Sequence, residues 1–402
     1  MKYLFIGGIF PEKQMKEIIN NSKGLIQFSS NNFQKKILNG LRKYINDELI
    51  ILSAPFVNSF PKGYKKIYQK QFKKEENLYF VGFNNLWGVR NVFRYYNLKK
   101  RVNEIYKNKK NKLEIIFVYS AHTPFLKLAL YLKKCNPNIK IILILPDLPE
   151  YMNLTNKNKT LYSLFKKIDI KIFYSLVKKV DGFIFLTKYM EEVIDYKKPN
   201  LIIEGISTIN ADFNKKIRNI EKNNCINITY TGTLHEKFGI KKLIEAFELL
   251  PSDKFKLNIC GDGDSVEYVY EKSNKNKNIN YLGQINSKES IKLQENSDIL
   301  INPRQNNEKF TRYSFPSKNM EYLSTGNPLI AYKLDGIPDE YNDIIFYPSD
   351  NSSKALANKI IEVSEMTNYQ LEIYKKKVLA ILKAKNEFNT GAKILNFIKE
   401  RL

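Results

Sequence analysis

The chain has 402 residues, of which 43% are hydrophobic, and its 66 Lys and Arg outnumber its 41 Asp and Glu by 25 charges. This length exceeds what one hydrophobic core supports and fits two domains, while the apolar content excludes global disorder. No apolar run reaches the roughly 18 residues that a membrane-spanning helix requires.

Short apolar segments alternate with helical and polar stretches in the first half, which predicts a parallel sheet with crossover helices. The first segment ends in Gly7-Gly8, and a helix is expected over Asn31 to Tyr44. The expected strands are Tyr3–Gly7, Glu48–Ala54, Leu78–Gly82, Ile115–Tyr119, Lys140–Leu145, Gly182–Leu186 and the short Asn200–Ile203.

A polar stretch from Asn210 to Asn224 predicts a linker, and a second set of alternating segments follows it. We therefore expect Rossmann-like domains over residues 1–205 and 206–385, followed by a separate helical segment over 386–402. The elements expected in the second half are the strands Ile226–Thr231, Phe255–Cys260, Asn278–Leu282, Ile299–Asn302 and Leu329–Tyr332, a helix over Ile240–Leu250 and a helical tail over Asn368–Leu402.

The segment from Tyr313 to Asp335 carries the strongest functional signal. An irregular stretch enters a helix through Phe315-Pro316-Ser317, where Pro suits the first turn because that turn needs no internal donor. The N-terminus of a helix favours anions, and a carboxylate one turn further in, Glu321, can accept hydrogen bonds from neighbouring hydroxyls. Phosphate at the helix start with a ribose one turn away predicts a nucleotide-diphosphate site. The alternative is an ordinary surface helix with a solvated Glu321.

The positions of the arginines favour the nucleotide-diphosphate site over an ordinary surface helix. Lysine dominates this half of the chain, yet Arg304 and Arg312 flank this one loop, and Lys318 lies beside them. A guanidinium binds phosphate with two parallel hydrogen bonds, which an ammonium group cannot do.

The run RYSFPSKNMEYLSTGNPLIAYKLDGIPDEY resembles the nucleotide-sugar-binding segment of retaining glycosyltransferases of the family 4 type, and within it a bacterial surface-polysaccharide subgroup. The resemblance implies an α/β GT-B fold, with two Rossmann-like domains facing a central cleft and a C-terminal helix crossing back to the first domain, a role that Ile394 to Ile398 would suit. The family has two glutamates eight positions apart. Glu321 matches the second, the ribose ligand, whereas Tyr313 stands where the first would be and carries no charge.

The resemblance also implies a donor-binding turn after the strand that ends at Thr231. Here Thr233 occupies the position of the family's arginine, and Lys237 lies one residue from the family's lysine, so we infer that Arg304, Arg312 and Lys318 supply the missing charge. A plain turn between strand and helix is the alternative. Gly261-Asp262-Gly263 is not a dinucleotide motif, because Val266 occupies the place of the third glycine. The donor-binding residues expected on this basis are Gly232, Thr233, Lys237, Gly283, Gln284, Ile285, Arg304, Arg312, Tyr313, Ser314, Phe315, Pro316, Lys318 and Glu321.

In the first half, His122 and Asp147 each follow the carboxyl end of a strand, where α/β sites form. A lone histidine in such a place is often structural, but His122 matches a family histidine close to the reacting sugar, and we expect both residues in the catalytic site. Gly7, Gly8 and Asn32 are expected on the acceptor side, because close backbone approach there would admit a ligand. No metal site is expected, because the sequence shows no metal-binding acidic pair and only two histidines.

The positive charge has two interpretations. It either reflects the codon bias of an AT-rich genome or attracts an anionic surface. Lys157 to Lys179 mixes Leu, Phe, Ile and Tyr with Lys, as an interfacial helix would, which favours a membrane over nucleic acid. Cys135, Cys225 and Cys260 are far apart and odd in number, which indicates a reducing compartment. We therefore expect a cytoplasmic protein, with peripheral attachment to the inner face of the membrane as a hypothesis and no nucleic-acid partner.

These observations predict a glycosyltransferase of the hexosyltransferase type that works without metal or cofactor. We expect its substrate to be a nucleotide-diphosphate sugar, its acceptor a lipid-linked glycan, and its place cell-surface polysaccharide or capsule biosynthesis. Retention of configuration is implied by the resemblance alone. The alternatives are a catalytically inactive GT-B scaffold subunit, favoured by Tyr313 and the displaced Lys237, and a nucleotide-sugar 2-epimerase, which two histidines equip poorly.

Overall fold

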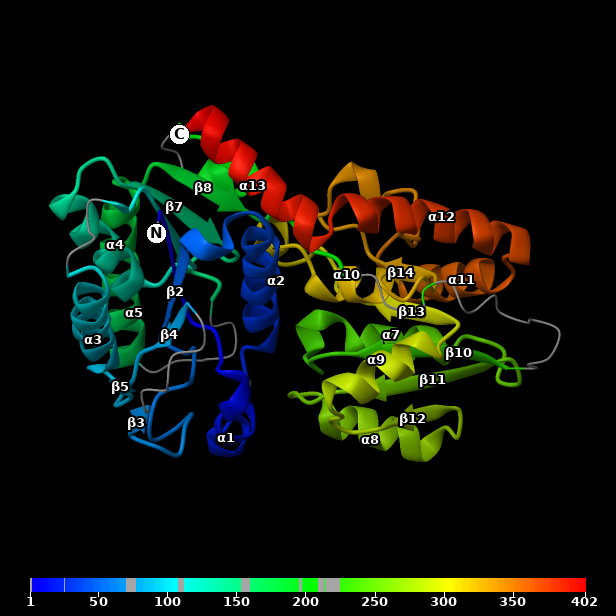
Figure 1. Cartoon of the computed structure of the whole chain (residues 1–402). Coiled ribbons are helices and arrows are strands. Elements are labelled where there is room, and N and C mark those ends of the chain that lie inside the picture. Colours follow the sequence, from blue (N-terminus) through cyan, green and yellow to red (C-terminus); the bar gives the residue numbers. More distant parts are fainter. Residues whose placement is uncertain are drawn as a thin grey trace. The chain divides into compact units, whose positions relative to one another are not determined.

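The computed structural model describes residues 2–24, 26–69, 77–107, 112–152, 160–194, 197–208, 213 and 225–402. The chain divides into two compact units, which are described separately below. Unit 1 comprises Met1–Glu204 together with Glu387–Leu402, and unit 2 comprises Gly205–Asn386 (Figure 1). The expected linker Asn210 to Asn224 lies outside the described residues except for residue 213.

Unit 1 contains a parallel sheet with the strand order β4-β2-β1-β6-β7-β8-β9. In its register, Phe5 of the central strand β1 lies beside Ile51 of β2 and Phe117 of β6. The strands are β1 (Tyr3–Gly7), β2 (Leu49–Ser53), β4 (Leu78–Phe80), β6 (Ile115–Tyr119), β7 (Lys140–Leu145), β8 (Gly182–Phe185) and β9 (Asn200–Ile202), with a small antiparallel pair β3 (Tyr68–Gln69) and β5 (Phe83–Asn84).

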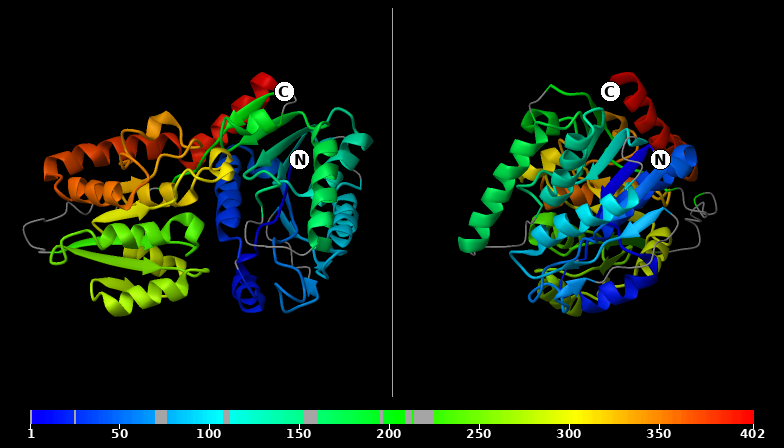
Figure 2. Two further views of the ribbon diagram at one scale, coloured as in Figure 1. Left: turned by 180° about the vertical axis from the view of Figure 1, so that it is seen from behind. Right: turned by 60° about the vertical axis from the view of Figure 1, so that its left-hand side comes forward.

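Helices cover both faces of this sheet. The cluster of α3, α4 and α5 lies on one face and α2 with α13 on the other, as the views from several sides show (Figure 2). Pro124 lies in the first turn of α4, where its missing backbone N–H costs no hydrogen bond because that turn has no internal partner for it. The helices are α1 (Met15–Asn21), α2 (Phe28–Ile45), α3 (Arg90–Ile105), α4 (Thr123–Cys135), α5 (Thr160–Val177), α6 (Met190–Val193) and α13 (Glu387–Arg401).

The helix α13 belongs to unit 1 although it follows unit 2 in the sequence. Glycines allow it to pack closely on α2. A Cβ at Gly391 would lie 2.2 Å from the carbonyl oxygen of Gly40, and a Cβ at Gly40 would lie 2.0 Å from that of Glu387. The tail, expected to be helical over Asn368–Leu402, is therefore two helices that belong to different units, with a break between Ala384 and Glu387.

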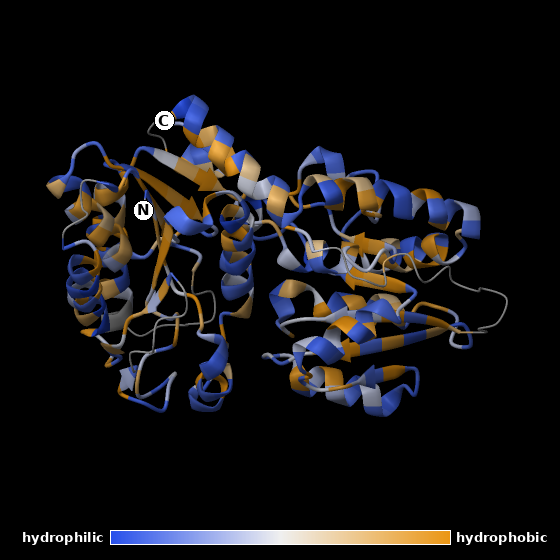
Figure 3. Cartoon of the chain, in the orientation of Figure 1, coloured by the Kyte–Doolittle hydropathy of each residue, from blue (hydrophilic) through white to orange (hydrophobic). Residues whose placement is uncertain are grey.

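Unit 2 contains a second parallel sheet, with the strand order β12-β11-β10-β13-β14. Hydrophobic residues are concentrated in the central strands of both sheets, as strands buried on two faces require (Figure 3). The elements are β10 (Ile226–Thr231), α7 (Ile240–Phe247), β11 (Phe255–Cys260), α8 (Val266–Lys275), β12 (Ile279–Tyr281), α9 (Ser287–Glu295), β13 (Ile299–Asn302), α10 (Ser317–Leu323), β14 (Leu329–Ala331), α11 (Ser353–Ser364) and α12 (Asn368–Ala384).

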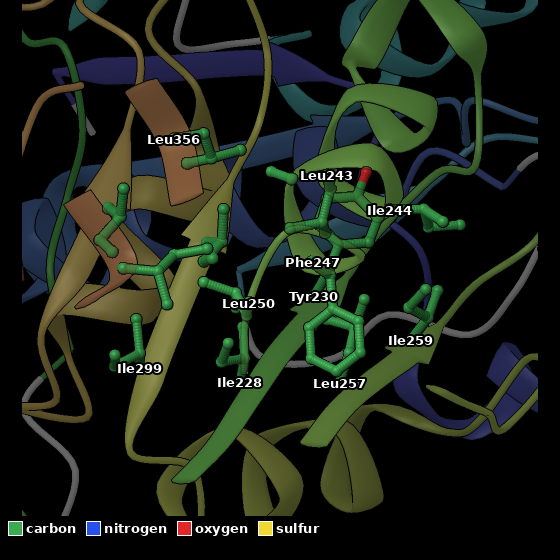
Figure 4. Close-up of a cluster of buried hydrophobic side chains, with 14 of the residues drawn as sticks. Ile228, Tyr230, Leu243, Ile244, Phe247, Leu250, Leu257, Ile259, Ile299 and Leu356 are labelled. Carbon is green, nitrogen blue, oxygen red and sulfur yellow. The ribbon is translucent and has the colours of Figure 1, made fainter. Parts of the chain in front are cut away.

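The core of unit 2 forms where α7 packs on the sheet. Leu243 and Phe247 of α7 lie over Ile228 of β10 and Leu257 of β11 (Figure 4). Hydrogen-bonded caps fix the starts of neighbouring helices, with Asn286 and Glu289 forming a capping box at α9 and Thr367 and Gln370 another at α12. Both units thus have the parallel, doubly wound sheets of Rossmann-like domains, as the sequence predicted.

Candidate functional site

The sheet of unit 2 reverses its strand order between β10 and β13, and in doubly wound sheets ligands bind at the carboxyl ends of the strands beside such a reversal. The turn after β10 ends at Gly239, whose φ of +85° only glycine adopts without strain. A Cβ at Gly239 would lie 1.9 Å from the carbonyl oxygen of Pro303, in the segment that follows β13. Glycine therefore lets the two expected donor-binding segments meet at this point.

Arg304 is held at the same place by aromatic rings. Its guanidinium lies 4.4 Å from the ring centre of Phe238, in the turn after β10, and 5.2 Å from that of Phe310. Such stacking fixes a cation without neutralising it. The structure therefore places positive charge beside the turn that carries Lys237, although the family's own arginine position is Thr233.

Three glycine turns lie together at this edge of the sheet. A Cβ at Gly261 would lie 1.7 Å from the carbonyl oxygen of Gly232, and the N–H of Gly261 donates to the carbonyl of Gly283 at 2.9 Å. A Cβ at Gly263 would lie 2.4 Å from the carbonyl oxygen of Leu234. These distances give Gly261 and Gly263 a packing role and bring Gly232 and Gly283 to one edge. Of the other residues expected there, Thr233, Lys237 and Ile285 are half-buried and Gln284 is exposed.

Glu321 is part of a polar network that joins three elements. Its Oε1 accepts from Nζ of Lys318 at 2.7 Å and from Nε2 of Gln294 at 2.6 Å. Gln294, in α9, is fully buried, and its Nε2 also lies 2.8 Å from Oγ1 of Thr231 and 3.0 Å from Oγ of Ser290. Side chains from α9, α10 and the end of β10 thus fix the orientation of the carboxylate.

The network rests on a buried tyrosine. The hydroxyl of Tyr322 accepts from the N–H of Thr231 at 2.8 Å and donates to its carbonyl at 3.0 Å, which ties α10 to the end of β10. Burial, and next the neighbouring Tyr230, raise the pKa of Tyr322 well above its usual range, so this phenol remains a neutral donor and acceptor. Burial also raises the pKa of the Cys260 thiol to about 11, against the opposing influence of Lys318.

The helix that follows Pro316 is short. It covers the seven residues of α10 and ends at Leu323. A helix of two turns contributes little dipole, so positive charge at this site comes from side chains such as Lys318 and Arg304 rather than from the helix start.

The residues directly before α10 are either buried or half-buried. Phe315 is buried and its ring lies 5.2 Å from that of Tyr341, while Pro316 is also buried. Tyr313 and Ser314 are half-buried at the end of a 3-10 turn. Arg312 lies further out, with its Nη1 4.0 Å from Oδ2 of Asp335, both side chains being about 40% exposed.

In unit 1 the strand order reverses between β1 and β6. Gly7 ends β1 and Gly8 begins the turn after it, where the N–H of Gly8 donates to Oε1 of Gln34 at 2.9 Å. A Cβ at Gly7 would lie 2.4 Å from that same oxygen. Asn31 of α2 is buried and accepts a backbone N–H of the same turn, whereas Asn32 is exposed. The predicted helix does approach the glycine turn, and Asn31 and Gln34 make the contacts.

His122 lies on the other side of this reversal, at the start of α4. Its Nε2 is 3.0 Å from Nη1 of the buried Arg94, and its ring centre is 4.2 Å from that of Phe125. Asp147 is exposed in the loop after the adjacent strand β7, where it is close enough to Tyr119 to influence the pKa of that phenol. Both expected catalytic residues therefore occupy the carboxyl edge of the same sheet.

Sequence reasoning missed Gln294, Thr231 and Arg94. Each is a single polar residue in a helix or at a strand end, without a spacing pattern that would distinguish it from a surface residue. A signal was available only for Thr231, which directly precedes the glycine turn. The described part of the chain contains no group of three or more His, Cys, Asp or Glu side chains arranged to hold a metal ion. No helix within that part is both long and apolar enough to span a membrane.

Comparison with known proteins identifies the domain that carries the network around Glu321. Residues 210–378 match the family described as "Glycosyl transferases group 1". A search of curated protein sequences finds no match to the chain.

Solved structures share the fold of the whole chain. A sucrose-phosphate synthase from Thermosynechococcus elongatus superposes with a TM-score of 0.63 at 11% identity, covering 100% of this chain and 99% of its own. The lipopolysaccharide outer core galactosyltransferase WaaB in its apo form gives 0.62 at 14%, with both chains fully covered. Anabaena Alr3699/HepE in complex with UDP gives 0.60 at 13%, covering 99% and 100%. These likenesses establish the GT-B fold, and the expected α/β fold class with two Rossmann-like domains is confirmed.

Proposed function

We propose that the chain moves a sugar from a nucleotide-diphosphate donor to a glycan acceptor, because residues 210–378 match the group 1 glycosyl transferases and the chain has the GT-B fold. The single observation that carries this proposal is the network around Glu321. Both hydrogen bonds that this carboxylate accepts from described residues end on Oε1, from Lys318 and Gln294. Oε2 is then available to accept hydrogen bonds from the hydroxyls of a ribose. Because the carboxylate is already oriented, a ligand would bind it without the entropic cost of ordering it.

The glycine turn and the cations beside it would stabilise the negative charge of the diphosphate. Arg304, stacked on Phe238, and Lys318, beside Glu321, supply cations, and the backbone of the Gly232 turn supplies N–H donors. Gly283, Gln284 and Ile285 follow β12 at the same edge of the sheet and would contact the base. Tyr313 would offer its hydroxyl to the donor sugar. We expect transfer to continue in EDTA, since these groups take the place of a metal ion.

His122 and Asp147 serve the sugar and acceptor. An acceptor oxygen forms the new bond to the anomeric carbon while the bond from that carbon to the phosphate oxygen breaks. The acceptor's proton passes to an oxygen of the departing diphosphate on the same face, so the configuration is retained and no separate base is required. Gly7 and Gly8 provide close backbone approach on the acceptor side. Asn32, being exposed, would contact only a ligand that extends beyond the turn.

We further propose that the acceptor is lipid-linked and belongs to cell-surface polysaccharide or capsule synthesis at the inner face of the membrane. The support comes from α5, where Leu164 and Phe165 are more than half exposed and Lys167 and Lys171 are exposed nearby. The ring of Phe165 meets that of the exposed Trp87 at 5.8 Å, which extends the apolar surface. Apolar residues with lysines around them suit an anionic bilayer. The residues 153–159 at the start of the basic segment lie outside the described part.

Flotation with liposomes tests the membrane proposal. The protein should float with vesicles that contain anionic phosphatidylglycerol, and Phe165→Ser should reduce that fraction several-fold because it removes apolar area from the contact. The control is Leu249→Ser, because Leu249 is a similarly exposed apolar residue in unit 2. Failure of the unaltered protein to float would overturn this part of the proposal and leave the donor site untouched.

Thermal stabilisation by UDP, GDP, ADP and dTDP sugars tests the donor proposal. A ligand that binds only the folded protein raises its melting temperature. One nucleotide class should do so, and Glu321→Ala should abolish the shift. Glu362→Ala is a matched control, because Glu362 pairs with Lys359 at the same i,i+3 spacing as Lys318 and Glu321 but on α11. No shift with any sugar nucleotide would favour the inactive scaffold instead.

A further inference from the structure

Arg94 is a buried cation without a carboxylate partner among the described residues. It is 2% exposed, its Nη2 donates to the carbonyl of Pro55 at 2.9 Å, and its guanidinium stacks 4.1 Å from the ring centre of Phe83. Its remaining contact is His122, whose Nε2 is 3.0 Å from Nη1. Burying a charge without an opposite charge is costly, so its place beside His122 requires an explanation.

The contact fixes the proton of His122. A guanidinium carries five donors and no acceptor, so Nε2 must accept from Arg94 and the proton of a neutral ring must lie on Nδ1. Burial, and then the charges of Arg94 and Arg90, lower the pKa of His122 well below its usual 6.5, which keeps the ring neutral. The charged groups that act on this ring are these two arginines of α3. Two uncharged rings also lie beside it, Phe56 in the loop after β2 and Phe125 in α4.

The ring that carries this proton has a fixed direction. It lies 4.2 Å from the ring centre of Phe125 and 5.4 Å from that of Phe56. Ser120, two residues earlier, holds the loop in a left-handed conformation with φ of +73°, which a non-glycine residue adopts only at a cost. Nδ1 is buried and has no hydrogen-bond partner among the described residues. A buried donor without a partner is rare, and a ligand atom can complete it.

We propose that Arg94 is a positioning residue, which holds His122 in the Nδ1–H form so that this nitrogen donates a hydrogen bond to an oxygen of the substrate. His122 then neither accepts nor releases a proton during transfer. The identity of the oxygen, a sugar hydroxyl or a phosphate oxygen, rests on the proposed function. The state of the ring does not, because it follows from the contact with Arg94 and from the burial of the ring.

Nuclear magnetic resonance tests the state of the ring in the unaltered protein. The chain has only two histidines, so ¹⁵N-histidine labelling yields two imidazoles, and His235→Gln assigns them. Long-range proton–nitrogen spectra should show His122 as the neutral Nδ1–H form throughout pH 6 to 8. The Nε2–H form, or titration of His122 near its ordinary pKa of about 6.5, would overturn the proposal.

Substitution tests the consequence for catalysis. In Arg94→Met, Nε2 loses its donor and Nδ1 can become an acceptor, so kcat should fall at least about tenfold at pH 8, with a smaller change in KM. Removal of the Arg94 charge raises the pKa of His122 although the ring stays buried, so at low pH the ring of the variant gains a second proton and Nδ1 donates again. The ratio of variant to unaltered kcat should therefore rise at low pH. A merely structural role predicts a ratio that does not change with pH.

The control is Arg101→Met, on the same helix, because Arg101 pairs with Glu104 near the surface at 2.9 Å. It should leave both kcat and the pH profile unchanged. Equal activity of Arg94→Met and the unaltered protein would overturn the proposal. If Arg94→Met does not fold, the spectra of the unaltered protein still test whether His122 is in the Nδ1–H form. If the protein transfers no sugar, the spectra separate failure of the proposed function from failure of this inference.

Discussion

Nε2 of the buried Gln294 lies 2.6 Å from Oε1 of the half-exposed Glu321, although the two residues belong to different helices. The same carboxylate oxygen accepts from Lys318 at 2.7 Å. A neutral amide and a cation thus both bind Oε1, and Oε2 is left to a ligand. A ligand would meet an oriented group and would not have to order it, which reduces the entropic cost of binding.

Gln294→Leu should weaken binding of the donor. Loss of a buried hydrogen bond to a charged group costs about 1 to 2 kcal/mol, which corresponds to an increase of about five- to thirtyfold in Kd. Isothermal titration with the sugar nucleotide that stabilises the protein measures this change. Gln305→Leu removes a glutamine whose amide donates to the carbonyl of Asn351 at the surface, and it should leave Kd unchanged. Equal affinities for both variants would contradict the role of Gln294.

Gly239→Ala should destabilise unit 2 more than a change in backbone conformation alone explains. Gly88 also has a positive φ but nothing within 4 Å of its would-be Cβ, so Gly88→Ala should cost only about 1 to 2 kcal/mol. Gly239→Ala adds an overlap with the carbonyl of Pro303 and should cost more. Gly24→Ala, with neither feature, should be close to neutral. Urea denaturation of the three variants measures the order, and a Gly239 variant no weaker than the Gly88 variant would contradict it.

Cys260 should resist alkylation in the folded protein. With a pKa of about 11, only about one thiol in a thousand is ionised at pH 8, and the group is also buried. Iodoacetamide followed by mass spectrometry should label the exposed Cys135 at least about a hundredfold faster. The thiol form is favoured in the folded state, so its contribution to stability is complete below the unfolded pKa of about 8.5 and decreases as the pH rises toward 11. Equal labelling of Cys260 and Cys135 would contradict the burial of the Cys260 thiol.

Gly391→Ala should lower the melting temperature of unit 1. Alanine favours a helix by about 1 kcal/mol over glycine, so the substitution would stabilise α13 if its surroundings were open. The new Cβ would instead lie 2.2 Å from the carbonyl of Gly40. Calorimetry should therefore show destabilisation by Gly391→Ala, whereas Lys393→Ala, at a position of the same helix that is not buried, should cause little change. A stabilised Gly391 variant would disprove the close packing of α2 and α13.

The strands could be predicted from the sequence because apolar runs such as Lys140 to Leu145 are too short for helices and have no polar face. The structure has this strand with the same bounds. Helix ends were less predictable. The helix expected over Ile240–Leu250 ends at Phe247, because loss of a terminal turn costs little when packing continues beyond it.

The polar contacts of the candidate site could be predicted only where they depend on local sequence. Glu321 and the glycine turn have recognisable spacing within one segment. Gln294 and Arg94 acquire their importance from residues 27 and 28 positions away, and a single sequence contains no signal for such pairs. The antiparallel pair of β3 and β5 was missed for a related reason, since two-residue strands have no period to detect.

The packing of α13 on α2 has a consequence for biosynthesis. A ribosome synthesises residues 205–386 after most of unit 1 and before α13. The surface of α2 around Gly40 therefore stays uncovered until α13 emerges, which happens only after all of unit 2 has been synthesised. Domains that emerge first usually fold first, but here the earlier unit is completed later. A nascent chain can finish unit 2 while the apolar flank of α2 is still exposed to chaperones. Translation that stopped after residue 386 would release one complete unit and one unfinished unit.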